Sequence, residues 1–226
     1  MTESAETMRD ARAELLAAPG RLTDLPSRFA PVDGRTRSAA VLMLFGRLDS
    51  LPADSTDAPV AADLDVLLQR RSATLSSHAG QVSFPGGARD AGDRDAVATA
   101  LREAEEETGL DPSGVDVLAT LPELPIMPSR YLVTPVLAWW RTPSRVAAVD
   151  HAETVDVFRV PVAELLAPEN RYTSTLQREG REFRGPAFDI DGIIVWGFTA
   201  MVLDGLFDAT GWTIPWDPSV ERPVQP

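Results

Sequence analysis

The chain has 226 residues and a formal net charge of −13, from 21 basic and 34 acidic residues. This length suits one domain with extensions, because domains usually span roughly 100–200 residues. The sequence contains no cysteine, and all of its basic residues are arginine. The composition therefore excludes disulfides, cysteine-bound zinc, thiol nucleophiles, the lysine of a Walker phosphate loop and lysine Schiff bases. The acidic balance disfavours a protein that coats nucleic acid or anionic lipid.

No segment predicts a membrane anchor. Apolar runs such as residues 38–45 and 192–195 are far shorter than the ~20 residues that a membrane-spanning helix needs. Residues 1–10 are acidic and polar and lack the apolar core of a signal peptide. We therefore expect a cytoplasmic protein that binds neither a membrane nor nucleic acid.

The spacing of apolar residues predicts strands interleaved with helices. Helical spacing first occurs at residues 7–18, which end at Pro19-Gly20, a stop signal. Strands are predicted at residues 37–48, 63–71, 80–84, 115–121, 131–140 and 154–160, a hairpin at 173–179 and 183–191, and helices at 95–108, 161–166 and 193–207. This mixture is typical of an α/β layer fold. We expect a helical appendage at residues 1–19, one domain at 20–211 and a proline-rich tail at 212–226.

The clearest predicted helix is unusually acidic near its end. Glu103, Glu106 and Glu107 are three and four residues apart, so they share one face, expected to be exposed, while the stripe with Leu101 and Ala104 turns into the core. Like charges at this spacing destabilise a helix by a few tenths of a kcal/mol per pair. A bound cation would offset that cost, and oxygen ligands without nearby His or Cys favour Mg²⁺ or Mn²⁺. The alternative is a solvated acidic face without a function.

The sequence around this helix favours the functional interpretation. Phe84-Pro85-Gly86-Gly87 precedes the helix, and its glycines permit close backbone approach. The stretch from Gly87 to Leu110 resembles the Nudix box, G-x5-E-x7-R-E-U-x-E-E-x-G-U, in which U is aliphatic. Every position from Arg102 onward matches, if an alanine is allowed at one U. The first half departs from the pattern, because Asp93 replaces the glutamate and one extra residue follows it, so the role of Asp93 stays open.

Further segments are similar to the coenzyme A pyrophosphatase branch of the Nudix family, which has the same lengthened box. They are residues 67–72, 75, 78–82 and 84–87 before the helix, and 151–155, 160–161 and 194–200 after it. The resemblance covers about residues 37–207. Ser76 departs from it, because the branch usually has a basic residue there. This departure concerns the assignment to coenzyme A and not the assignment to the Nudix family.

The resemblance implies an α/β protein with a Nudix-type α/β/α sandwich and a mixed β-sheet. It also implies a metal-dependent hydrolase that cleaves the phosphoanhydride of a small nucleotide substrate. In this branch the substrate is coenzyme A or a derivative, and the products are 3′,5′-ADP and 4′-phosphopantetheine. The alternatives are hydrolysis of another nucleoside diphosphate, such as ADP-ribose or a damaged nucleotide, and a Nudix-fold binding module without turnover. The resemblance is also compatible with a homodimer.

Roles for individual residues also follow from the resemblance. The ligands of Mg²⁺ or Mn²⁺ would be Glu103, Glu106, Glu107 and the carbonyl of Gly87, so that the ions neutralise the diphosphate and orient a water for attack. Arg102 would orient the glutamates by pairing with one of them. The catalytic set is then Glu103, Glu106, Arg102 and Glu153. Glu153, a carboxylate from a later part of the sequence that would reach the metals, is the candidate general base. The alternative is that Glu153 is simply a solvated loop residue.

Expected substrate contacts come from the segments before the helix. They are Arg70, Arg71, His78, Gln81, Phe84 and Gly86. Alternation along a strand predicts that only one of the two arginines faces the site. His78 would contact the substrate, brace its loop or be purely structural. Trp196 is interpreted as core packing rather than a nucleobase platform. Of Trp139 and Trp140, one is expected in the core and the other exposed or at an interface.

Overall fold

The computed structural model describes residues 10–30, 34–49, 59–72, 80–126, 129–149, 154–178 and 180–225. The helices in these ranges are α1 (Ala11–Ala17), α2 (Ala96–Thr108), α3 (Val162–Leu166) and α4 (Gly197–Thr210). The strands are β1 (Arg37–Arg47), β2 (Leu64–Arg71), β3 (Val82–Ser83), β4 (Gly86–Ala88), β5 (Val115–Thr120), β6 (Leu124–Ile126), β7 (Tyr131–Trp140), β8 (Thr154–Pro161), β9 (Arg171–Arg178), β10 (Arg181–Ile190), β11 (Ile193–Val195) and β12 (Glu221–Pro223). Several predicted elements match these closely, above all α2, β1, β2, β5 and β7.

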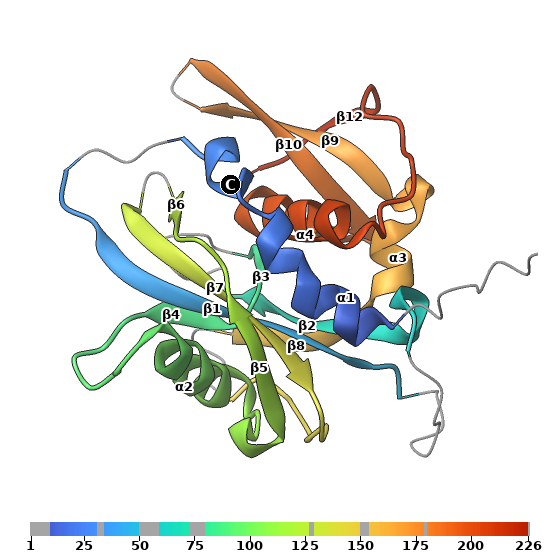
Figure 1. Cartoon of the computed structure of the whole chain (residues 1–226). Helices are drawn as coiled ribbons and strands as arrows, with labels where there is room; N and C mark the ends of the chain where they lie inside the picture. Colours follow the sequence, from blue (N-terminus) through green and yellow to red (C-terminus); the bar gives the residue numbers. More distant parts are fainter. Residues whose placement is uncertain are drawn as a thin grey trace, which may run out of the picture.

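The larger of two sheets has eight strands and is mixed. Its main path runs β3-β2-β1-β7-β5, and β4, β6 and β8 pair with β1, β7 and β2 respectively. β1 and β7 are parallel, from the pair Arg37↔Tyr131 to the pair Phe45↔Trp139, while the other strand pairs are antiparallel. The mixed sheet of the expected fold is therefore present (Figure 1).

Helices cover both faces of this sheet, as Figure 1 shows, with α2 on one face and α1 and α4 on the other. In β1, Leu42 and Leu44 join the core cluster beneath α2, whereas Met43 and Phe45 join the cluster beneath α1 and α4. All four side chains are fully buried. A strand covered on both faces has a continuous apolar sequence. The predicted α/β fold, with helices on both sides of a mixed sheet, is therefore confirmed.

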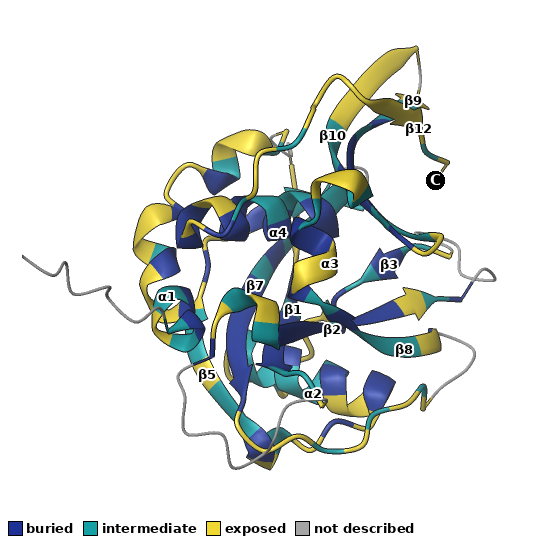
Figure 2. Cartoon of the chain, turned by 90° about the vertical axis from the view of Figure 1, so that its right-hand side faces the viewer, coloured by how far each residue is buried: buried dark blue, intermediate teal, exposed yellow. Residues whose placement is uncertain are grey.

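The same double coverage explains an error about the paired tryptophans. Trp139 and Trp140 were expected to be one buried and one exposed, but both are buried, at 8% and 2% exposure. Trp139 belongs to the cluster beneath α1 and α4, and Trp140 to the cluster beneath α2. β7 lies between β1 and β5, so both of its faces are core. Figure 2 shows the resulting band of buried residues through the sheet.

A second sheet of four strands, ordered β11-β10-β9-β12, lies beyond α4 (Figure 1). The predicted hairpin forms its centre as β9 and β10. The predicted helix from residue 193 was wrong at its start, because residues 193–195 form β11 and α4 begins at Gly197. Asp191 and Gly192 have positive φ values of 50° and 84° and turn the chain back onto β10. A run that is apolar all round does not separate a buried strand from a buried helix.

The chain segments before and after the expected domain pack onto it. Ala11 and Leu15 of α1 are fully buried in the core shared with α4, and Trp212 after α4 lies in the same cluster. Trp212 Nε1 donates a hydrogen bond of 2.6 Å to Glu14 Oε2. β12 pairs in parallel with β9 at the edge of the second sheet. The division at residues 19 and 211 stays a proposal. No helix of the described residues is long and apolar enough to cross a membrane.

Candidate functional site

The acidic helix α2 is fixed at both ends by local sequence. The Asp95 side chain accepts a hydrogen bond of 2.8 Å from Ala98 N, and Gly109 ends the helix in the left-handed conformation at φ 68°. Its buried face carries Ala100 and Ala104, both fully buried. Leu101, expected in the buried stripe, is only partly buried. The sheet-facing side is thus rotated toward residues 100, 104, 107 and 108, which places a glutamate in the interior.

That glutamate, Glu107, was expected on an exposed face but is buried. Its Oε2 accepts hydrogen bonds from Gln69 Nε2 at 2.7 Å and from Gly86 N at 2.8 Å. The guanidinium of Arg71 lies 3.7 Å from its Oε1. Burial raises the pKa of Glu107 to about 7, against the lowering effect of these three partners and with a further raising effect from Glu103. A cation at this position would stabilise the charged form of a desolvated carboxylate.

A second glutamate, Glu103, lies against the glycine turn. A Cβ placed on Gly87 would meet the carboxylate atoms of Glu103 at 2.5–2.7 Å. At Gly86, φ is +153° and a Cβ would overlap the backbone of Ala40 and Val41. The two glycines therefore let the chain pass between β1 and α2 at the point where Glu103 and Glu107 project.

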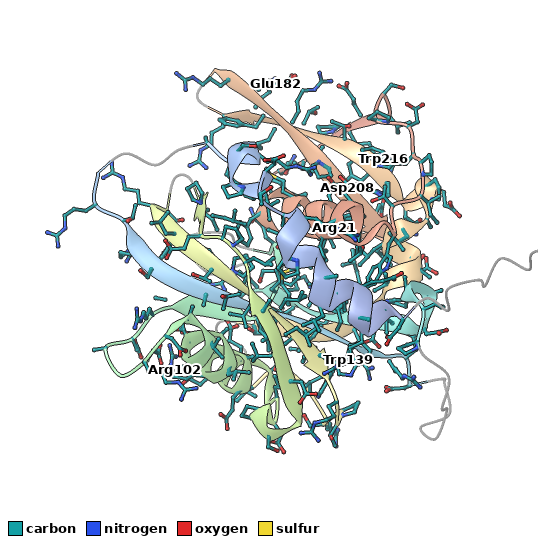
Figure 3. The ribbon with its side chains drawn as sticks, in the orientation of Figure 1. Arg21, Arg102, Trp139, Glu182, Asp208 and Trp216 are labelled. Carbon is teal, nitrogen blue, oxygen red and sulfur yellow. The ribbon has the colours of Figure 1, made fainter. Side chains whose placement is uncertain are left out.

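Arg102 pairs with three carboxylates at once and lies on α2 in Figure 3. Its Nε and Nη2 donate to Oδ1 and Oδ2 of Asp93 at 3.1 and 3.0 Å. Its Nη1 is 2.9 Å from Glu106 and its Nη2 is 3.0 Å from Glu103. The resemblance implied pairing with one glutamate, and the structure has two.

The role of Asp93, which the sequence left open, follows from this pairing. Oδ2 of Asp93 also accepts hydrogen bonds from Thr99 Oγ1 and Asp90 N, each at 2.9 Å. The hydrogen bonds from Arg102 hold the pKa of Asp93 well below its usual range. Asp93 therefore ties the loop before α2 to the arginine that orients the glutamates, despite the extra residue in the box.

The glutamates offer oxygen donors suited to Mg²⁺ or Mn²⁺ but do not form a ready cage. Among the described residues, no three His, Cys, Asp or Glu side chains converge on a common metal position. Glu103 and Glu106 face Arg102 instead, and Glu107 is bonded to N–H groups. The fit to a hard cation rests on the donor chemistry, the buried Glu107 and the close Gly87–Glu103 contact. Binding would require Glu103 and Glu106 to turn away from Arg102.

Alternation along β2 separates the two predicted arginines, as expected. Arg71 lies beside Glu107, on the same side of the strand as Gln69. Arg70 pairs with Asp156 at 3.1 Å and lines a cavity together with Gln81. Of these two arginines, only Arg71 therefore faces the glutamates.

Two other predicted substrate contacts have structural roles. Phe84 is 1% exposed and belongs to the hydrophobic core, so its side chain is not available to a ligand. The backbone N–H of Gly86 is already bonded to Glu107. Phe84 follows β3, and its burial in the core anchors the turn to β4. His78 and Glu153 lie outside the described residues.

One residue of this site was not predicted from the sequence, and the interpretation of Trp196 was wrong. Gln69 is fully buried and links Glu107 to Thr154, whose Oγ1 donates to Gln69 Oε1 at 3.2 Å. Its signal was a lone amide in an otherwise apolar strand segment. Trp196, interpreted as core packing, is only partly buried and lines the same cavity as Arg70.

Known proteins of one family are similar to this chain. A family model described as the NUDIX domain matches residues 52–177. The Nudix hydrolase NudL of Photorhabdus laumondii is 40% identical over 141 residues, which are 62% of this chain and 74% of that protein. Nudix hydrolase 22, chloroplastic, of Arabidopsis thaliana is 37% identical over 180 residues, 77% of this chain and 55% of that protein. A solved Nudix hydrolase from M. smegmatis, RenU, is 26% identical with a TM-score of 0.43 and covers 58% of this chain and 74% of its own.

The fold, the acidic helix and the glycine turn thus occur in a protein with a Nudix domain. The chain belongs to the Nudix hydrolase family, and the predicted resemblance to that family is confirmed.

Proposed function

We propose that this chain is a metal-dependent Nudix hydrolase that cleaves the phosphoanhydride bond of coenzyme A or its derivatives. The products would be 3′,5′-ADP and 4′-phosphopantetheine. The observation that carries the hydrolase proposal is the buried Glu107, held by Gly86 and Gln69 with Glu103 beside it and Arg71 opposite. A solvated acidic face would not bury a carboxylate with donors on one side and a like charge on another.

In the proposed site, a few side chains bind the metal, position its ligands or bind a phosphate. Glu103, Glu106, Glu107 and the carbonyl of Gly87 would hold Mg²⁺ or Mn²⁺. Such an ion, when bound, neutralises phosphate charge and lowers the pKa of a bound water. Arg102 positions the glutamates, and Arg71 supplies a cation for a phosphate on the same side of the sheet. In a chain of net charge −13, these local cations are what an anionic substrate requires.

Support for coenzyme A is narrower than support for hydrolysis. It comes from the segments around the box that are similar to the coenzyme A pyrophosphatase branch. ADP-ribose or a damaged nucleotide is the alternative substrate, and a binding module without turnover is the alternative to an enzyme. Glu153 as the general base, a cytoplasmic location and a homodimer remain predictions from the sequence.

Incubation of the full chain with coenzyme A and Mg²⁺ or Mn²⁺ tests the proposal. We expect chromatography to detect 3′,5′-ADP, and Glu103→Gln to abolish its formation. Glu105→Gln is the matched control, because Glu105 lies exposed on the same helix. If only ADP-ribose gave a product, the proposed substrate would be wrong and the proposed type of reaction would be correct. No product from any nucleoside diphosphate would contradict the hydrolase.

A further inference from the structure

A cavity of about 420 Å³ lies where the end of β2 and strand β3 meet the second sheet. One wall comes from Arg70, Gln81 and Val82, and the opposite wall from β9, the β10–β11 turn and β12 with the residues that follow it. A volume of this size is within the range of small-molecule sites, about 300–1,000 Å³. The proposed metal ligands and Arg102 lie outside this lining, whereas Arg70 and Gln81, two of the expected substrate contacts, belong to it.

Two arginines from opposite walls bring positive charge to the cavity. Arg222 of β12 lies over the ring of Tyr172 at 4.8 Å and pairs with Asp189 at 3.1 Å. Arg70 pairs with Asp156 at 3.1 Å. Both guanidinium side chains remain about half exposed, at 49% and 46%. Each therefore keeps donors for a further anion, and arginine binds phosphate with two parallel hydrogen bonds.

An aromatic surface and a helix end adjoin these charges. Trp196 is partly exposed and lines the cavity. It is also the N-cap of α4, and among the described residues no side chain makes a capping hydrogen bond there. The N–H groups of this turn add positive potential next to the indole ring. An indole beside arginines suits a planar aromatic ring that carries phosphate.

The cavity adjoins the glutamate site along two stretches of chain. Arg70 and Arg71 are consecutive, and Arg71 lies beside Glu107. Val82 precedes Gly86 by four residues, so their Cα atoms are at most about 14 Å apart. Thr199 Oγ1 donates to the carbonyl of Val82 at 3.1 Å and fixes α4 against β3. Because Arg70 and Arg71 point to opposite faces of β2, one nucleotide would reach from the cavity to the glutamates around the end of this strand.

We propose that this cavity binds the nucleoside part of the substrate, with the base against Trp196 and a phosphomonoester between Arg70 and Arg222. The proposal rests on the proposed function, because it assigns the cavity to the same substrate. Its ligand class is a nucleoside that carries a phosphomonoester in addition to the diphosphate. The C-terminal strand β12 then belongs to the binding site, since it supplies Arg222.

Binding without turnover tests the cavity directly. Isothermal titration of the full chain with adenosine 3′,5′-bisphosphate, without added metal, should show binding that Trp196→Leu and Arg222→Gln each weaken at least tenfold. Adenosine 5′-monophosphate should bind more weakly than the bisphosphate, and Arg222→Gln should reduce that difference. Arg181→Gln is the matched control, because Arg181 is an exposed arginine of the same sheet outside the cavity lining.

The outcomes separate this proposal from the hydrolase. Binding by the unaltered chain and by Glu103→Gln, without hydrolysis of any diphosphate, would support the cavity and contradict the hydrolase. If both cavity variants hydrolysed coenzyme A with unchanged KM and bound the bisphosphate with unchanged affinity, the proposal for the cavity would be wrong. The hydrolase proposal would stand. Absence of bisphosphate binding to the unaltered chain would also overturn the proposal for the cavity. Circular dichroism checks folding, and Arg222→Gln decides the result if Trp196→Leu does not fold.

Discussion

The backbone N–H of Gly86 donates a hydrogen bond of 2.8 Å to Oε2 of the buried Glu107. The same oxygen accepts a bond from Gln69, so a turn, a strand and a helix meet at one carboxylate. This junction fixes where α2 ends relative to the glycine turn. The effects of substitutions at the site therefore depend on which of these groups each one disturbs.

Glu107→Gln should lower kcat/KM strongly and leave the chain folded. The amide has nearly the same shape, and its oxygen can still accept the hydrogen bonds from Gly86 and Gln69, but the substitution removes a proposed metal ligand. Loss of a group that only supports a metal ligand costs about 10–100-fold, so loss of a ligand should cost at least as much. Steady-state kinetics with coenzyme A and a thermal melt check both parts. Near-normal activity would refute the ligand assignment, and Glu105→Gln is the control.

Alanine at the two glycines of the turn should give opposite results. Gly87→Ala places a methyl group on the Glu103 carboxylate, a flexible end that moves aside, so activity should fall while the melting temperature changes little. Gly86→Ala places a methyl group on the backbone of β1 at φ +153°, so it should destabilise the fold. Gly92→Ala, with nothing within 4 Å, is the control. Equal losses of stability in both variants would contradict this division.

Asp93→Asn should make the stability of the fold depend less on pH in the acidic range. Arg102 lowers the pKa of Asp93 in the folded chain, so its stabilising effect is present above the unfolded pKa of about 3.9 and is lost as the pH falls further. The variant should be less stable than the unaltered chain at pH 7, and the difference should narrow below about pH 4. Thermal melts from pH 7 to pH 3 measure it. A constant difference across this range, or an equal effect in Asp90→Asn, would count against the pairing.

Leucine-to-alanine substitutions should distinguish the core beneath α2 from the partly exposed side of this helix. Leu67→Ala removes a fully buried side chain beneath α2 and should cost about 2–5 kcal/mol in the free energy of unfolding. Leu101→Ala removes one that is only partly buried and should cost less. Urea unfolding of both variants measures the contrast. A larger cost at Leu101 would show that the helix is rotated from its position in the structure.

The sequence predicted the parts of this fold that depend on local pattern. The spacing of apolar residues and Gly109 predicted α2 to within one residue, and an unbroken apolar run predicted β1. The burial of Glu107 could not be predicted in this way, because its partners Gly86 and Gln69 are 21 and 38 residues away in the chain. The same limit applies to Trp196, whose surroundings include Arg70 and β12. Such positions depend on which distant strands meet.

Arg102 also affects the stability of the protein in the absence of a divalent metal ion. By contacting Glu103 and Glu106, its guanidinium serves as a resident counter-ion that relieves the repulsion along the helix. The negative charge of this helix turn is therefore balanced even when a chelator removes divalent ions. The protein should stay folded without any divalent ion. Metal uptake then becomes an exchange of one positive partner for another, and not a condition for folding.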